Sequence, residues 1–140
     1  MKVSHVLETA LYVDDLVRAE QFYVEVLGLT VIGQPDRRHV FLRCGQRMLL
    51  LFNPLVSREP SGEIPPHGSF GPGHVAFGVA ENSLDTWSAW LTERGVAIER
   101  TIAWPQGGRS LYFRDPAGNS LELATPKIWG IGEETLANYR

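Results

Sequence analysis

Residues 7–29 read LETALYVDDLVRAEQFYVEVLGL, and two successive patterns divide this stretch. Over residues 7–13 the side chains alternate between two faces, which is typical of a strand packed on one side. Asp14 or Asp15 then offers a helix N-cap, and apolar residues recur at helical spacing until Gly28, a residue suited to the position after a helix. The stretch therefore predicts a strand followed by a helix.

The rest of the chain continues this pattern and then repeats it. Three short β-like runs follow at 30–33, 39–44 and 47–52, and the second copy has a strand at 74–79, a helix from Asn82 or Ser83 to Gly95, and strands at 96–101, 109–114 and 120–124. Equivalent positions lie 66 to 72 residues apart, as Val79 and Val13 or Pro126 and Pro54 illustrate. We therefore expect an α+β protein built from an internal duplication of one βαβββ module.

The two modules cover about residues 6–54 and 73–126, which together form a single predicted domain over 1–140. Residues 55–72 are rich in Pro, Gly and Ser, and we expect a linker or lid without helix or strand there. Residues 127–140 form a tail.

Composition excludes several classes of protein. The chain has 140 residues, 44% of them apolar, so it is long enough for one packed core. Its net charge is −3 without a basic cluster, so we expect no nucleic-acid partner. It has no long apolar run and a lone Cys44, which favours a cytoplasmic protein without membrane contact.

Strand alternation sorts the side chains of both modules into two faces. The face expected to pack under the helices carries bulky apolar residues, namely Leu11, Val13, Val40, Leu42, Leu49, Leu51, Val75, Phe77, Val79, Leu111, Phe113, Leu121 and Leu123. The opposite face places ionisable residues beside very small ones, with Ala10, Ala76, Gly78 and Ala124 among them. This face resembles the lining of a cup.

Three residues of the cup face are candidate metal ligands. Glu8 is equivalent to His74 in the duplication, and Leu50 is equivalent to Glu122. One imidazole and two carboxylates suit a divalent cation and leave coordination positions open, as Lewis-acid chemistry requires. Taken singly, each residue also fits a hydrogen-bonded or solvated strand position.

The chain resembles the vicinal oxygen chelate superfamily, which includes glyoxalases, extradiol dioxygenases, fosfomycin-resistance thiol transferases, methylmalonyl-CoA epimerase and bleomycin-binding proteins. The resemblance rests on residues 8–29, on GHVAFGV at 73–79 and on LYFRDPAGNSLELATP at 111–126. It implies paired βαβββ modules in a curved, mainly antiparallel sheet with helices outside. The cup of that sheet would hold a metal chelated by adjacent oxygens of the substrate.

Carried over by position, the resemblance implies that Glu8, His74 and Glu122 are the metal ligands. Leu50 departs from the pattern, because glyoxalase I has a fourth protein ligand there, so we do not expect the glyoxalase I reaction. Extradiol dioxygenases and fosfomycin thiol transferases manage with three ligands, although both commonly have His at the position of Glu8.

The leading hypothesis is therefore a metal-dependent lyase, isomerase or dioxygenase acting on a small substrate with two adjacent oxygens, and using Mn, Fe(II), Ni, Zn or Mg. Glu122, or Glu8 if it is loosely held, is the predicted general base, and Tyr112 is the predicted proton donor or hydrogen-bond partner. The predicted substrate-binding residues are Arg43, Arg114, Phe41, Met48, Leu50 and Phe52. The two arginines are equally compatible with structural ion pairs.

Two alternatives stay open. A metal-free protein that binds a drug or metabolite in the same cup, as bleomycin-resistance proteins do, is consistent with Leu50. A purely structural dimer module would leave Glu8 and His74 in solvent. The resemblance also implies modules that pair across chains, so we predict a homodimer whose site takes Glu8 from one subunit and His74 with Glu122 from the other.

Overall fold

The computed structural model describes residues 1–139. Arg140, the last residue of the predicted tail, lies outside the described residues. The chain forms two compact units, one over Met1–Gly71 and the other from Pro72 onward, which we call the first half and the second half.

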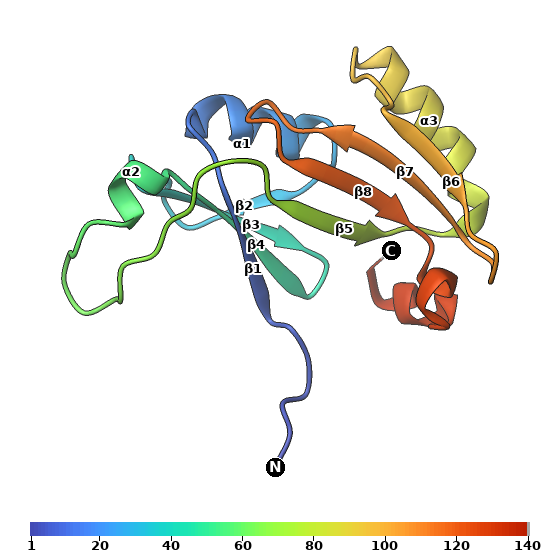
Figure 1. Ribbon diagram of the computed structural model, residues 1–140, viewed down its shortest axis with the longest axis horizontal. Helices are drawn as coiled ribbons and strands as arrows, with labels where there is room; N and C mark the ends of the chain where they lie inside the picture. Colours follow the sequence, from blue (N-terminus) through green and yellow to red (C-terminus); the bar gives the residue numbers. More distant parts are fainter. Residues whose placement is uncertain (140) are drawn as a thin grey trace. The chain divides into compact units, whose positions relative to one another are not determined.

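The first half is a four-stranded sheet with a helix against one face (Figure 1). Its elements are β1 (Glu8–Tyr12), α1 (Leu16–Glu25), β2 (Thr30–Ile32), β3 (His39–Cys44), β4 (Arg47–Phe52) and α2 (Pro54–Ser57). The strand order is β1-β4-β3-β2, with β1 parallel to β4 and the other pairs antiparallel.

The second half repeats this topology. Its elements are β5 (His74–Gly78), η1 (Glu81–Ser83), α3 (Leu84–Glu93), β6 (Arg100–Ala103), β7 (Arg109–Arg114), β8 (Ser120–Ala124), η2 (Pro126–Trp129) and η3 (Glu133–Tyr139). The order is β5-β8-β7-β6, again with one parallel pair, β5 and β8. The predicted α+β fold of two βαβββ modules is confirmed.

The two residues expected at the ends of α1 have the predicted roles. Asp15 is the N-cap of α1 and accepts a hydrogen bond from the backbone N–H of Arg18, 3.0 Å away. Gly28 has φ of 72°, a left-handed conformation that glycine adopts without strain. The helix buries Ala19 and Tyr23, which places its apolar side against the sheet.

Each half has its own core on the predicted face of its sheet. Most of the predicted inward residues are buried, including Leu42, Leu51, Phe113 and Leu121, each at 0% exposure. Val75, Phe77 and Val79 of the second half are half-buried. The faces assigned from alternation are therefore the observed ones.

Two local differences from the sequence prediction have physical causes. β6 spans Arg100–Ala103 and not the predicted 96–101. The backbone N–H of Val96 is taken by the carbonyl of Leu91 at the end of α3, so the chain pairs with β7 only after it has left the helix. The predicted linker contains part of α2, because Asn53 caps the backbone N–H of Leu55 and Pro54 occupies the first helical turn. The Asn-Pro pair is a helix-start signal that the linker assignment overlooked.

The tail packs on the second half. A Cβ built on Gly78 would lie 3.1 Å from Leu136 Cδ2, and the backbone N–H of Glu81 donates to Glu133 Oε1 at 2.6 Å. None of the helices among the described residues has the length and hydrophobicity needed to cross a bilayer.

Candidate metal site and apolar hollow

Two predicted ligands meet in the second half. His74 on β5 and Glu122 on β8 project from the same face, and Nε2 of His74 lies 3.3 Å from Oε2 of Glu122. The parallel pairing of these strands places His74 opposite Ser120 and Ala76 opposite Glu122. Because Ala76 has only a methyl group, the imidazole and the carboxylate can approach across it. We call these two side chains the His74–Glu122 pair.

The orientation of the imidazole is set by the backbone. His74 Nδ1 lies 2.9 Å from the carbonyl oxygen of Ser120. Since a carbonyl only accepts hydrogen bonds, we assign the hydrogen to Nδ1, which leaves the lone pair of a neutral ring on Nε2. Nε2 and Glu122 Oε2 are then two acceptors facing each other, and this arrangement is stable only with a proton or a metal cation between them.

The Glu122 carboxylate is held by Ser110. Glu122 is 5% exposed, and its Oε1 accepts a hydrogen bond of 2.6 Å from the hydroxyl of Ser110 on β7. Oε2 is the oxygen directed at His74. One carboxylate oxygen is therefore fixed by the protein and the other faces the imidazole.

Tyr112 completes the polar group of the second half. It lies opposite Glu122 in the β7–β8 register, and its ring is 6.4 Å from the His74 ring at an interplanar angle of 20°. Burial raises the pKa of Tyr112, and the Glu122 carboxylate raises it further, while Ser110 acts in the opposite direction. Tyr112 therefore keeps its proton at neutral pH, as a hydrogen-bond donor must.

Whether this group fits a metal is decided by the donor atoms. Histidine ligands of metals usually donate their other ring N–H to a carbonyl or carboxylate, and carboxylate ligands are usually hydrogen-bonded as well. His74 and Glu122 both have such supporting contacts. Within each half, the described His, Cys, Asp and Glu residues form no group of three that would enclose an ion. The second half thus fits two ligands of a divalent cation, and a third must come from elsewhere.

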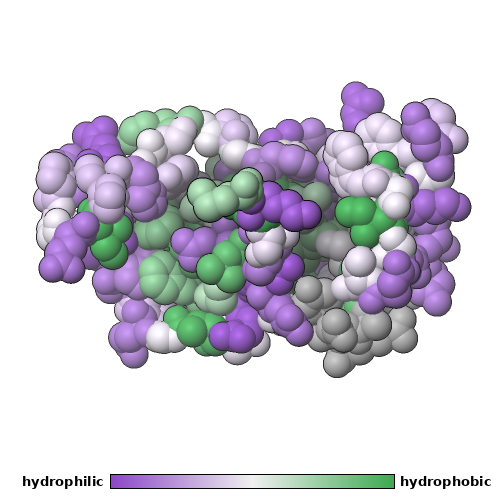
Figure 2. Space-filling model, turned by 90° about the horizontal axis from the view of Figure 1, so that it is seen from below, coloured by the Kyte–Doolittle hydropathy of each residue, from purple (hydrophilic) through white to green (hydrophobic). Residues whose placement is uncertain are grey.

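The first half has a hollow in place of the polar group. The hollow has a volume of about 490 Å³, and Figure 2 shows apolar surface gathered over this part of the molecule among hydrophilic side chains. Its lining consists of Glu8, Thr9, Ala10, Arg38, Phe41, Met48, Leu50, Phe52, Ile64 and His67. The hollow therefore brings together Glu8 and all four predicted apolar substrate contacts. We call it the first-half hollow.

Glu8 stands at the position equivalent to His74. It lies opposite Met48 on β4, just as His74 lies opposite Ser120 on β8, and its side chain is exposed. The carboxylate is thus accessible to a ligand in the hollow.

The two predicted arginines differ in their surroundings. Arg114 donates two hydrogen bonds to the Glu99 carboxylate, at 2.7 and 3.1 Å, and a third to the carbonyl of Gly118. The hydrogen bonds of its guanidinium are therefore made to residues of its own half. Arg43 occupies the equivalent register position and is exposed, without such a pair in the first half.

Several residues near these sites escaped the sequence analysis. His67 donates to or accepts from the Tyr12 hydroxyl at 2.7 Å and packs edge-on against Phe52, 4.5 Å away. Arg38 lies over the ring of Phe52 at 5.0 Å. Both belong to segments without periodic pattern, and only the proximity of Arg38 to the strand start at residue 39 hinted at its position.

Comparison with known proteins places the chain in a class. Residues 2–123 match the family model described as the Glyoxalase/Bleomycin resistance protein/Dioxygenase superfamily. The chain therefore belongs to this superfamily, and the predicted resemblance to vicinal oxygen chelate proteins is confirmed.

Individual relatives carry different names. The chain is 36% identical to the glutathione transferase FosA of Serratia marcescens, covering 81% of this chain and 74% of that protein. It is 31% identical to the metallothiol transferase FosB of Staphylococcus epidermidis, covering 89% and 84%. It is 30% identical to the catechol-2,3-dioxygenase of Bacillus subtilis, covering 86% of this chain and 41% of that one.

Solved structures agree with this class. A crystal structure of lactoylglutathione lyase from Agrobacterium tumefaciens is 40% identical, covers 94% of this chain and all of that chain, and has a TM-score of 0.90. Together these relatives support a metal-dependent enzyme of the vicinal oxygen chelate type in general.

Proposed function

We propose that the protein is a metal-dependent enzyme acting on a small substrate that chelates a divalent cation through two adjacent oxygens. The observation that carries this proposal is the His74–Glu122 pair, in which two acceptor atoms 3.3 Å apart face each other. A proton or a divalent cation shared between them would satisfy both, and the named relatives favour the cation. Relatives named metallothiol transferase, catechol dioxygenase and lactoylglutathione lyase support the same kind of site.

In this proposal His74 and Glu122 supply two ligands and Glu8 supplies the third. Glu8 belongs to the other half, and we propose that it comes from the second subunit of a homodimer. The metal would be Mn, Fe(II), Ni, Zn or Mg, and when bound it polarises a substrate carbonyl or stabilises an oxyanion. We place this enzyme in the cytoplasm, because its single Cys44 is free.

The chain's own groups then have distinct tasks. Oε2 of Glu122, the oxygen that Ser110 does not bind, would hold the metal and could receive a substrate proton only after leaving it. Glu8, if it is loosely held, is the other proposed general base. Tyr112, whose pKa is raised by burial, keeps its proton and donates a hydrogen bond or the proton itself. The first-half hollow would take the apolar part of the substrate against Phe41, Met48 and Leu50.

For the arginines we propose different roles. Arg43 is exposed and offers a charge to an anionic substrate group. Arg114, bound by Glu99, would contribute only if that ion pair opened.

One observation favours a second function, a metal-free protein that binds a drug or metabolite. The first-half hollow is lined largely by apolar side chains. At the position where the second half has the carboxylate of Glu122, the first half has the apolar Leu50. Such a protein would bind an apolar ligand without any ion.

Isothermal titration of chelator-treated protein with Mn²⁺ separates the two functions. We expect the wild-type protein to bind Mn²⁺, and we expect Glu122→Gln to weaken binding by at least about 100-fold, or about 2.7 kcal/mol. Glu99→Gln is the matched control, because it removes an exposed carboxylate of the same half. Equal Mn²⁺ binding by Glu122→Gln and wild type would exclude the metal site, and binding of an apolar ligand without metal would then support the second function.

A further inference from the structure

We infer that Ser110 and Trp104 are positioning residues for Glu122, through a relay of two hydrogen bonds. The indole N–H of Trp104 donates to the Ser110 hydroxyl oxygen at 2.9 Å, and that hydroxyl donates to Glu122 Oε1 at 2.6 Å. The relay fixes the carboxylate so that Oε2 is left to face His74. This inference rests on the proposed metal site and adds the residues that orient it.

The direction of the relay follows from the chemistry of its members. An indole nitrogen only donates, so the Ser110 oxygen must accept from Trp104. A serine hydroxyl has one hydrogen, and a carboxylate oxygen only accepts. With one lone pair engaged by the indole, the hydroxyl hydrogen is directed to Glu122. The Trp104 bond therefore fixes the rotation of the Ser110 hydroxyl.

Both Ser110 and Glu122 are buried, so each hydrogen bond of the relay is costly to lose. Ser110 is 0% exposed and Glu122 is 5% exposed, so water does not replace a lost partner easily. Hydrogen bonds to a charged group in such a place are short and strong, and the 2.6 Å distance agrees with that. Removal of the Ser110 bond would leave Oε1 without this restraint, and removal of the Trp104 bond would leave the Ser110 hydroxyl free to rotate.

The loop that carries Trp104 is built to hold the indole. The backbone N–H of Trp104 donates to the carbonyl of Gly108, and the N–H of Gly107 donates back to the carbonyl of Trp104. Gly108 has φ of 85°, and a Cβ there would lie 2.7 Å from Thr125 Oγ1 and 2.6 Å from a methyl group of Ile128. Only glycine fits this turn.

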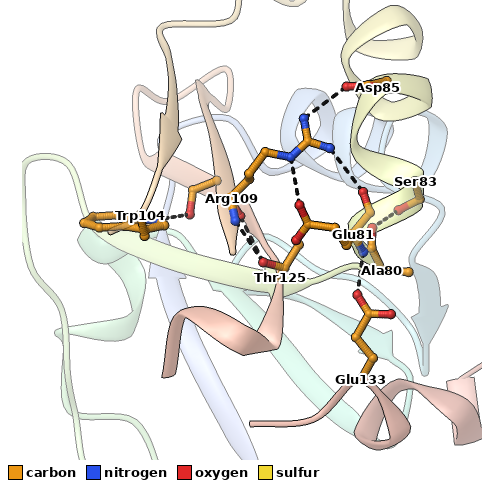
Figure 3. A network of polar contacts seen from close by, with 9 residues as sticks. Ala80, Glu81, Ser83, Asp85, Trp104, Arg109, Thr125 and Glu133 are labelled. Carbon is orange, nitrogen blue, oxygen red and sulfur yellow. Dashed lines mark hydrogen bonds and ion pairs between the residues drawn. The ribbon is translucent and has the colours of Figure 1, made fainter. Parts of the chain in front are cut away.

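The first residue of β7 is anchored as well. Figure 3 shows Arg109, which precedes Ser110, bonded to Thr125, Glu81 and Asp85, with Trp104 directed at the same strand. The Arg109 guanidinium donates to Glu81 Oε1 at 3.0 Å and to Asp85 Oδ1 at 3.2 Å. The strand end that carries Ser110 is thus tied to η1 through Glu81 and to the first turn of α3 through Asp85.

The first half lacks this relay, although its sheet has the same topology. The counterpart of Glu122 is Leu50, and the counterpart of Ser110 is His39, whose ring stacks on Phe41 at 3.9 Å. An apolar residue needs no orienting hydrogen bonds. The relay therefore accompanies the carboxylate and is not a general feature of the module.

The test combines metal affinity with a signal that needs no metal. By isothermal titration with Mn²⁺, we expect Ser110→Ala to weaken binding about 10- to 100-fold, as loss of a ligand's supporting contact does. Trp104→Phe, which keeps a ring but removes the donor, should weaken binding less. Ser110→Thr, which keeps the hydroxyl, should restore the affinity toward that of the wild type. Ser57→Ala is the matched control, because Ser57 is also a buried serine but its hydroxyl has no hydrogen-bond partner among the described residues.

In metal-free protein the indole N–H resonance of Trp104 reports on the relay directly. It is identified by its loss in Trp104→Phe, and we expect it to shift in both Ser110→Ala and Glu122→Gln but not in Ser57→Ala. If Glu122→Gln loses Mn²⁺ while Ser110→Ala and Trp104→Phe bind it like the wild type, the metal site stands and the relay is refuted. If the wild type binds none of Mn²⁺, Fe²⁺, Ni²⁺, Zn²⁺ and Mg²⁺, the proposed function fails, and the relay stands or falls on whether Glu122→Gln shifts the indole resonance.

Discussion

The two halves share a topology and differ in chemistry. Both pair their first strand in parallel with their last, and Ala10 lies opposite Leu50 as Ala76 lies opposite Glu122. Yet the first half presents an apolar hollow with one exposed carboxylate, whereas the second presents an imidazole, a buried carboxylate and a tyrosine. The comparison teaches that the βαβββ fold depends on the inward face, while the opposite face is free to carry either an apolar hollow or a polar group.

The largest effect should come from the inward face, where the halves are alike. Phe113 and its counterpart Leu42 are both 0% exposed. We expect Phe113→Ala to cost about 3–5 kcal/mol and Leu42→Ala about 2–5 kcal/mol, because each leaves a cavity in a packed core. Urea unfolding and calorimetry measure both values.

The same pair of variants tests whether the halves form one domain. We predict a single cooperative transition for the whole chain, lowered by either substitution. Two transitions, each sensitive to one variant only, would contradict the single domain over residues 1–140. Val17→Ala, at an exposed position of α1, is the control.

A second prediction makes the first half resemble the second. Leu50→Glu adds a carboxylate at the position equivalent to Glu122, and we expect Mn²⁺ affinity to rise about tenfold, or about 1.4 kcal/mol. Any native activity should fall, because the new ligand would take the coordination position proposed for substrate. Leu50→Gln serves as the uncharged control. Unchanged affinity in a folded Leu50→Glu protein would mean that Leu50 and the His74–Glu122 pair do not meet.

The smallest effect concerns the two equivalent arginines. The hydrogen bond from Arg114 lowers the pKa of Glu99 despite the opposing effect of desolvation, so this ion pair stabilises the folded state above the pKa of an unfolded glutamate. That contribution is lost as the pH falls below about 4 and through the lowered folded-state pKa. We expect Glu99→Gln to lower the Tm by about 1–2 °C at pH 7.

Thermal scans between pH 7 and pH 2.5 check this sign. The Tm difference between wild type and Glu99→Gln should shrink toward zero at the acid end. Arg43→Gln, which breaks no comparable pair, should leave Tm nearly unchanged across the range. A difference for Glu99→Gln that grows on acidification would contradict the assigned direction.

Local sequence signals were sufficient for most of the fold. Strands β3, β4, β7 and β8 begin and end where alternation and turn residues placed them, because each has Gly, Asp or Asn next to at least one end. The internal repeat indicated the βαβββ order of elements in both halves, but the strand order within each sheet and its parallel pair were not predicted. What alternation did not give was the start of β6, since residues 96–98 have a strand-like pattern without ladder partners.

The candidate site was only partly accessible from sequence. Parity along the strands and the offset between the modules were enough to bring His74 and Glu122 together. Ser110 and Trp104 were missed as a relay, because a hydrogen bond between side chains on a strand and a loop leaves no periodic trace. His67 was assigned to a featureless linker, and its contact with Tyr12 depends on the path of that loop.

The parallel pairing of the outer strands has a consequence for how the chain folds. β1 can pair only after β4 has been synthesised, and β5 only after β8. Each parallel pair therefore joins residues about forty or more positions apart in the chain. Contacts this distant slow folding compared with hairpin pairing. During synthesis the antiparallel hairpin β3–β4 can form first, with β1 already outside the ribosome and its edge unpaired. We therefore expect the first strand of each half to be the segment of a nascent chain most prone to pair with another chain. The sheet is completed only if this strand stays unpaired until its own last strand is available.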